Sequence, residues 1–170
     1  ASMIENPDFP QWLERLAREG AFPLNRLEVE VTENTLVANV ASAQVNLQCL
    51  RTMGVSVALD DFGTGYSGLY HLTQLAIDKI KIDRSFLDST LDNQNEMVRA
   101  ILALGKSLRM QITAEGVEHE RLAHWLAENG CDFAQGYLFG RPLPPGRVMD
   151  VLACQQALQE QSPLRAGGLG

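Results

Sequence analysis

Strand patterns and helical patterns alternate along almost the whole chain, and this alternation restricts the fold more than any other feature. Five short apolar segments with period-two alternation are separated by segments whose apolar residues recur at helical spacing. Strand–helix–strand connections are right-handed and place successive strands parallel in one sheet. We therefore expect an α/β fold with a parallel sheet. The expected strands are residues 27–33, 55–60, 77–82, 110–115 and 133–138.

Size and charge exclude several classes of protein. The chain has 170 residues, which is enough for one domain with a sizeable core. Its net charge of −7, without a Lys/Arg cluster, argues against binding to a nucleic-acid polymer. Three widely separated cysteines fit a reducing cytoplasm better than a disulfide framework. We expect a cytoplasmic domain, either free or part of a membrane-anchored protein.

Polar residues occur near the carboxyl end of every expected strand, on the face opposite the apolar one. Alternation of side chains assigns them to a common face of the sheet. The carboxyl edge of a parallel α/β sheet is where functional sites are built. Carboxylate oxygens suit Mg²⁺ or Mn²⁺, and a cation would remove the repulsion between the adjacent Asp60 and Asp61. The five residues are Glu30, Asp60, Lys81, Glu115 and Gln135.

Each of these residues alone has a simpler explanation. An Asp-Asp-x-Gly segment is more often a turn after a strand, Lys81 could pair with Asp83, and Glu115 could stabilise a helix start. Five independent coincidences of face and position would be needed, so we favour the cation site. The three histidines have no shared metal spacing, and no phosphate-binding loop with its lysine occurs.

Five motifs, in order and spanning nearly the whole chain, resemble those of the EAL domain, a TIM-type barrel hydrolase of cyclic di-GMP in bacterial signalling. The motifs are "LEVEVTEN", "ALDDFGTGYSGL", "IDKIKIDRSFL", "ITAEGVE" and "QGYLFGRPLP". The resemblance implies hydrolysis of cyclic di-GMP to linear pGpG with two Mg²⁺ or Mn²⁺ ions. It also implies a homodimer formed through the segment after Asp61, and it is compatible with a flanking sensory or GGDEF domain.

The resemblance assigns a role to each matching residue. Glu30, Asp60 and Asp61 resemble metal ligands, and Glu115 resembles a further carboxylate at the metal pair, bound directly or through water. Lys81 and Gln135 resemble the residues that hold the attacking water. The remaining assignments are Glu33 as a support for the loop after Asp61, and Asp61 and Glu118 as contacts to the substrate.

The front of the family pattern is absent from this sequence. It contains no Glu-Ala-Leu signature and no asparagine strand after it. A TIM barrel of about 250 residues has about 31 residues per unit, so 170 residues correspond to about five of the eight units. We expect an incomplete barrel, with the C-terminal portion of an EAL domain in residues 1–160 and a mobile tail in 161–170. We expect these 170 residues alone to be inactive. The alternative is a non-catalytic receptor for cyclic di-GMP.

Overall fold

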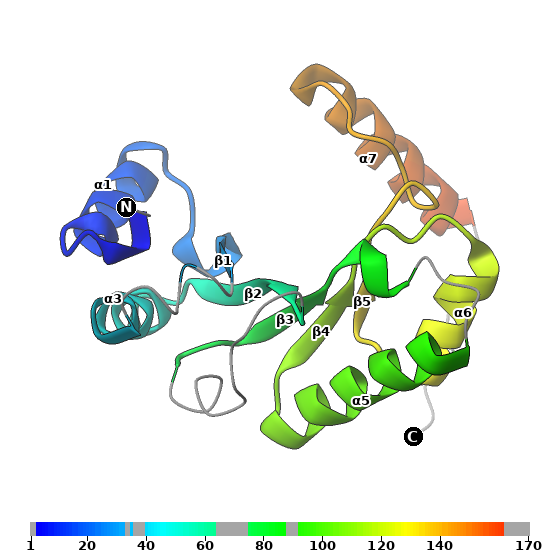
Figure 1. Cartoon of the computed structure of the whole chain (residues 1–170). Helices are drawn as coiled ribbons and strands as arrows, with labels where there is room; N and C mark the ends of the chain where they lie inside the picture. Colours follow the sequence, from blue (N-terminus) through cyan, green and yellow to red (C-terminus); the bar gives the residue numbers. More distant parts are fainter. Residues whose placement is uncertain (1–2, 33–34, 36–39, 64–74, 88–91, 162–170) are drawn as a thin grey trace, which may run out of the picture. The chain divides into compact units, whose positions relative to one another are not determined.

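Five parallel strands form one sheet whose strand order follows the order of the chain. The computed structural model describes residues 3–32, 35, 40–63, 75–87 and 92–161, and the outline that follows refers to these residues. Figure 1 shows the strands following one another from cyan to yellow. The expected parallel α/β sheet of five units is confirmed. The strands are β1 (Glu28–Thr32), β2 (Ser56–Phe62), β3 (Lys79–Ile82), β4 (Gln111–Ala114) and β5 (Phe133–Ala134).

Helices precede, connect and follow the strands. Their positions agree with the helical spacing of apolar residues in the sequence. The α-helices are α1 (Phe9–Glu19), α3 (Val40–Thr52), α5 (Asp92–Leu108), α6 (Glu120–Glu128) and α7 (Pro145–Gln161). The short 3₁₀ helices are η1 (Met3–Glu5), η2 (Leu24–Arg26) and η3 (Arg84–Phe86).

One face of the sheet carries the hydrophobic core. α3 packs against β2, and α5 packs against β3 and β4. Complete burial of aliphatic side chains such as these stabilises the fold by about 1.5–3 kcal/mol each. This face is used for packing, which leaves the opposite face for chemistry. The fully buried strand residues include Val57, Leu59, Ile80, Ile82 and Ile112, and Leu47 and Leu50 face them from α3.

Two aspartates fix the amino ends of the strands. Asp78, just before β3, accepts a hydrogen bond of 3.0 Å through Oδ2 from the backbone N–H of Val57 in β2. Asp132, just before β5, accepts one of 2.8 Å from the N–H of Ile112 in β4. Each carboxylate satisfies a backbone donor that the sheet ladder leaves open at the strand start. The repeated device holds neighbouring strands in register where they begin.

The strand expected over residues 133–138 is much shorter in the structure. β5 ends at Ala134, and the chain then follows the segment after β4 through bonds to its backbone. Gly136 has φ 156°, and a Cβ there would lie 2.3 Å from both N and O of Val117. This close approach, which only glycine permits, bends the chain away from a regular strand. The predicted length was therefore wrong, although the strand exists.

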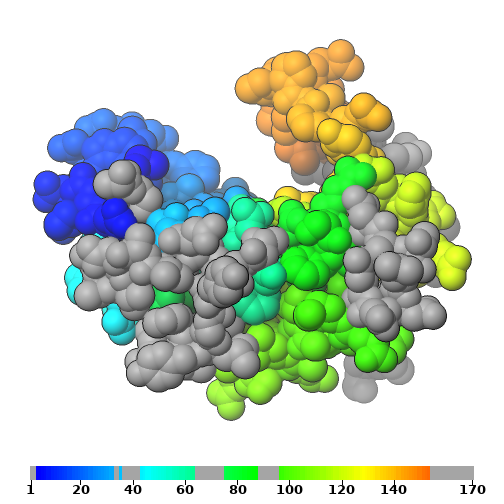
Figure 2. Space-filling view, viewed as in Figure 1, coloured from blue at the N-terminus to red at the C-terminus, as the bar shows by residue number. Residues whose placement is uncertain are grey.

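The chain forms two compact units. Residues up to Phe139 make the first unit, which contains the sheet, and residues from Gly140 make the second, which contains α7. Figure 2 shows much of the first unit's surface in green, from the segment of β3 to α5. Among the helices of the described residues, none has the length and apolar character of a transmembrane span. Most of the expected tail, residues 162–170, lies outside the described residues.

Candidate functional site

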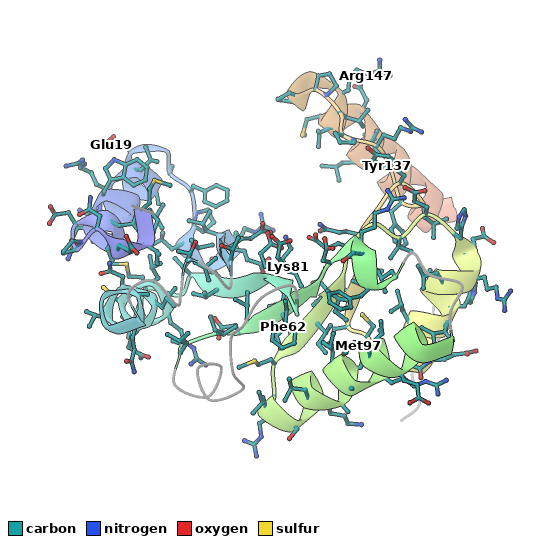
Figure 3. The ribbon with its side chains drawn as sticks, in the orientation of Figure 1. Glu19, Phe62, Lys81, Met97, Tyr137 and Arg147 are labelled. Atoms are coloured by element: carbon teal, nitrogen blue, oxygen red, sulfur yellow. The ribbon has the colours of Figure 1, made fainter. Side chains whose placement is uncertain are left out.

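Lys81 of β3 lies at the centre of a cluster of carboxylates from β1, from β2 and from the residue directly after β4. Its Nζ is 2.7 Å from Oε1 of Glu30, 3.2 Å from Oδ1 of Asp60 and 2.6 Å from Oε1 of Glu115. Gln135, one residue past β5, donates a hydrogen bond of 2.7 Å from Nε2 to the same oxygen of Glu115. Figure 3 shows Lys81 among oxygen atoms on one side of the sheet, with Phe62 on the side of α5. Each of the five strands thus supplies one side chain to the carboxylate cluster, from the strand itself (Glu30, Asp60 and Lys81) or from the residue directly after it (Glu115 and Gln135).

Strand alternation explains why these side chains meet. Glu30 and Lys81 lie on the face opposite the buried Val31 and Ile82 of their own strands. The parallel register pairs Thr32 with Asp60 across β1 and β2. The carboxyl ends of neighbouring strands therefore meet at one edge of the sheet. The face and the convergence that we expected from the sequence agree with this geometry.

A β-bulge places the two adjacent aspartates at the end of β2. Leu59 pairs with Ile80 and Phe62 with Ile82, so β2 contains one residue more than β3 over this stretch. Asp61 adopts the left-handed φ of 55°, which is uncommon for residues other than glycine. Bulges redirect side chains and occur next to functional sites. The bulge interrupts the regular alternation of side chains at Asp60 and Asp61.

The segment after β4 and the segment after β5 hold Glu115 and Gln135 together. The N–H of Gln135 donates to the carbonyl of Ala114 (2.9 Å), and the N–H of Val117 donates to the carbonyl of Gln135 (3.0 Å). The next residue, Gly136, lies directly against the backbone of Val117. Backbone bonds thus fix Gln135 on both sides. Its amide reaches Glu115 from a rigid position.

The charges of the cluster do not balance. Three carboxylates surround one ammonium group, which leaves an excess of two negative charges. Burial by itself would lower the pKa of Lys81, but the hydrogen bonds to Glu115 and Glu30 and the nearby carboxylate of Asp60 outweigh it and hold that pKa above its usual value. Lys81 is therefore a permanent cation in the folded protein. Its side chain is only 6% exposed.

Asp60 has an oxygen without a hydrogen bond. Its Oδ1 is buried and accepts no hydrogen bond, although Nζ of Lys81 lies 3.2 Å away, because the contact is an ion pair without hydrogen-bond geometry. A buried carboxylate oxygen in this state is costly unless a cation balances it. In the described part of the chain, no group of three His, Cys, Asp or Glu side chains is arranged to hold a metal ion. The donor chemistry, hard oxygens with excess negative charge, nevertheless fits Mg²⁺ or Mn²⁺.

A second ion pair lies on the same face as the carboxylate cluster, two residues closer to the amino ends of β1 and β3. Lys79 of β3 pairs with Glu28 of β1, with Nζ 2.5 Å from Oε2. The same Nζ lies 4.9 Å from the centre of the Phe133 ring, in cation–π geometry. The alternation that places Lys81 and Glu30 on this face also applies to the residues two positions earlier. The sequence prediction did not include this ion pair because it was restricted to the polar residue closest to the carboxyl end of each strand.

Comparison with known proteins decides the family. The family model described as "EAL domain" matches residues 1–142, most of the chain. The chain belongs to the EAL domain family. The family resemblance seen in the motifs is therefore confirmed.

Proteins with sequences similar to this EAL domain include cyclic di-GMP phosphodiesterases. The cyclic di-GMP phosphodiesterase NbdA of Pseudomonas aeruginosa is 42% identical over 142 residues, which cover 82% of this chain and 18% of NbdA. The bifunctional diguanylate cyclase/cyclic di-GMP phosphodiesterase MucR of the same organism is 40% identical over 131 residues, 76% of this chain and 19% of MucR. The chain thus spans about a fifth of the length of these relatives.

Solved EAL domain structures share the fold. The complex of PaMucR phosphodiesterase with c-di-GMP superposes with a TM-score of 0.80 at 35% identity, over 87% of this chain and 62% of that one. The manganese/cy-diGMP complex of Klebsiella pneumoniae BlrP1 has a TM-score of 0.74 at 32% identity, over 82% of this chain and 36% of that one. The five strands therefore correspond to part of a larger, TIM-barrel-like EAL domain.

The structure describes two of the three other predicted site residues, Glu118 and Asp61. Glu118 forms an ion pair of 2.7 Å with Arg84 of η3, a partner that sequence reasoning missed. Asp61 is partly buried at the bulge, one residue after Asp60. Glu33 lies outside the described residues. The roles of all three stay predictions.

Proposed function

We propose that this chain provides the hydrolytic residues of an EAL domain that converts cyclic di-GMP to linear pGpG with the help of Mg²⁺ or Mn²⁺. The observation that carries the proposal is the convergence of Glu30, Asp60, Glu115 and Gln135 on Lys81 at the carboxyl edge of the sheet. Such a convergence makes a poor core and a good site for a phosphodiester and its cations. The names of the relatives support the same substrate.

Four carboxylates would hold the cations. The excess negative charge of the cluster and the buried oxygen of Asp60 without a hydrogen bond support this assignment. When bound, divalent ions stabilise the negative charge that develops on the phosphodiester and favour ionisation of the attacking water. The proposed ligands are Glu30, Asp60, Asp61 and Glu115, the last one directly or through water.

Lys81 and Gln135 would position the attacking water. The ammonium group of Lys81 keeps its charge and donates hydrogen bonds only, and the amide of Gln135 is fixed by the backbone on both sides. Both groups contact the same oxygen of Glu115. A water molecule inserted into either contact would accept a hydrogen bond from Lys81 or Gln135 and donate one to the carboxylate of Glu115. This arrangement orients the water and offers an acceptor for its proton.

Asp61 and Glu118 would contact the substrate, and Glu33 would support the loop after Asp61. The ion pair with Arg84 orients the carboxylate of Glu118 in the segment after β4. Asp61 is fixed by the bulge next to Asp60. Fixed carboxylates suit the recognition of N–H donors on a guanine base.

The 170 residues by themselves would not hydrolyse cyclic di-GMP at a useful rate. Five parallel strands do not close an eight-stranded barrel, and the sequence contains no Glu-Ala-Leu segment. β1 and β5 are the edge strands of the sheet, and the site would lack ligands from further strands. Purification of the 170-residue chain, addition of Mn²⁺ and chromatography of pGpG test this. Turnover close to that of an intact domain would contradict it.

The domain would work as a homodimer next to a sensory or GGDEF domain. The segment that we expect at the dimer contact, residues 66–77, lies mostly outside the described residues. The bifunctional name of MucR supports a flanking diguanylate cyclase. Most homo-oligomers are two-fold dimers. Sedimentation of the intact domain should show a dimer, and a monomer at all concentrations would overturn this part.

Formation of pGpG by the intact domain tests the function itself. Incubation with cyclic di-GMP and Mn²⁺ should yield linear pGpG that chromatography separates from the substrate. Binding of cyclic di-GMP without any pGpG would favour the receptor that the sequence left as an alternative. The carboxylates retained at Glu30, Asp60, Asp61 and Glu115 favour the enzyme.

A further inference from the structure

A pocket of about 410 Å³ lies at the amino ends of β3 and β4, the opposite edge of the sheet from the carboxylate cluster. Arg51 at the end of α3 and Arg109 just after α5 both line it, together with Asp78. The apolar part of its wall includes Leu75, Ile77 and Met110. Two arginines and one aspartate leave this pocket with one net positive charge, in a chain whose net charge is −7.

Arg51 is oriented by Asp78 at the rim of this pocket. Its Nε pairs with Oδ1 of Asp78 at 3.0 Å, and the other oxygen of Asp78 accepts the backbone N–H of Val57. Asp78 is thus fixed by the sheet and orients the guanidinium through one nitrogen. Among the described residues, the two terminal nitrogens of Arg51 form no ion pair. A guanidinium oriented in this way is prepared for a planar, two-point contact with an anion.

Arg109 occupies a backbone position that favours glycine. Its φ is 58°, in the left-handed region, and its side chain is exposed. Arg109 directly follows α5, and the backbone bond from the N–H of Met110 to the carbonyl of Gly105 shows that its conformation closes the end of this helix. Within the described part of the chain its side chain forms no ion pair, so its guanidinium group is available at the pocket.

We propose that this pocket, here called the arginine pocket (Arg51, Arg109, Asp78 and the apolar wall), binds the phosphate group of a small organic phosphate. The two guanidinium groups match the oxygens of a phosphate, and the apolar wall accommodates the organic part of the ligand. The site lies at the edge of the sheet opposite Lys81 and does not depend on the proposed hydrolysis.

Calorimetric titration of the 170-residue chain with GMP, AMP, inorganic phosphate and guanosine tests the proposal. EDTA and constant ionic strength exclude binding through cations and unspecific salt effects. Both nucleotides should bind, inorganic phosphate should bind more weakly, and guanosine should not bind. Equal affinity for GMP and inorganic phosphate would show that the pocket binds inorganic phosphate alone. It would contradict the proposal that the apolar wall binds the organic part of the ligand. No binding of any phosphate at millimolar concentration would overturn all of it.

Arg109→Gly is the decisive variant because glycine suits the left-handed backbone at this position. It should fold as well as the wild type, with an unchanged or higher melting temperature, and should bind GMP about tenfold more weakly or worse. Arg121→Gln in α6 removes the same charge far from the pocket and should not change the affinity. Wild-type affinity in Arg109→Gly, or an equal loss in Arg121→Gln, would contradict the site.

Discussion

Nζ of Lys81 lies 2.6 Å from Oε1 of Glu115, the residue that directly follows the neighbouring strand β4. The same oxygen of Glu115 accepts the amide N–H of Gln135. One carboxylate oxygen therefore joins a buried cation to a neutral donor. This relationship links β3, β4 and the end of β5 at the edge where the substrate is proposed to bind.

Replacement of Lys81 by Met should remove activity and lower stability together. Three carboxylates would lose their shared cation, and the expected loss is about 2–3 kcal/mol, less than for a fully buried pair because the side chain of Glu30 is 48% exposed. Turnover of cyclic di-GMP should fall about 100-fold or more. Urea denaturation and a pGpG assay of the intact domain measure the two effects. A stable variant with normal turnover would show that Lys81 has neither role.

The contribution of Lys81 to stability should persist far into the alkaline range. The pKa of Lys81 is raised in the folded chain, so its stabilisation is fully present below the unfolded pKa near 10.5 and declines as pH rises through the folded value. The difference in unfolding free energy between wild type and Lys81→Met should stay constant from pH 7 to about pH 10. A decline near neutral pH would mean that Lys81 titrates there and is not a permanent cation.

Replacement of Lys79 by Met provides a matched control on the same strand and face. Loss of the pair with Glu28 and of the contact with Phe133 should cost about 1–2 kcal/mol, because both charged groups are partly buried. Lys79 touches none of the proposed ligands in the described residues, so turnover should stay close to wild type. Equal losses of turnover in the Lys79 and Lys81 variants would trace both to general destabilisation.

Gly136→Ala should disturb Gln135 without touching its side chain. A Cβ at this position would lie 2.3 Å from the backbone of Val117, so the segment after β5 must shift. Overpacking against a rigid backbone costs about 1–3 kcal/mol, and displacement of Gln135 should lower turnover more than affinity for the substrate. Thermal unfolding and steady-state kinetics measure this. Gly140→Ala, where a Cβ meets no atom of the described residues within 4 Å, is the control that should change neither.

Period-two alternation predicted most of the site because it is a local property of each strand. It assigned Glu30, Asp60, Lys81 and Glu115 to one face, and the parallel sheet then required their strand ends to meet. The same pattern places Lys79 and Glu28 on this face, where they form an ion pair farther from the edge.

Backbone irregularities were not predictable in this way. The bulge before Phe62 adds a residue that leaves no mark on the apolar pattern, and Asp61 gives no sign of its left-handed conformation. The early end of β5 depends on the approach of Gly136 to Val117, a contact between segments far apart in the sequence. The ion pair of Arg84 with Glu118 likewise depends on tertiary structure.

Turnover by the Asp60→Asn variant of the intact domain tests the account most directly. The change keeps the size of the side chain but removes the charge of a proposed metal ligand whose buried oxygen has no hydrogen bond. Formation of pGpG from cyclic di-GMP in the presence of Mn²⁺ is measured for the wild type, for Asp60→Asn and for Lys79→Met. We predict that Asp60→Asn forms no pGpG while the other two proteins do. Turnover by Asp60→Asn at the wild-type rate would contradict the assignment of the carboxylate cluster as the hydrolytic site.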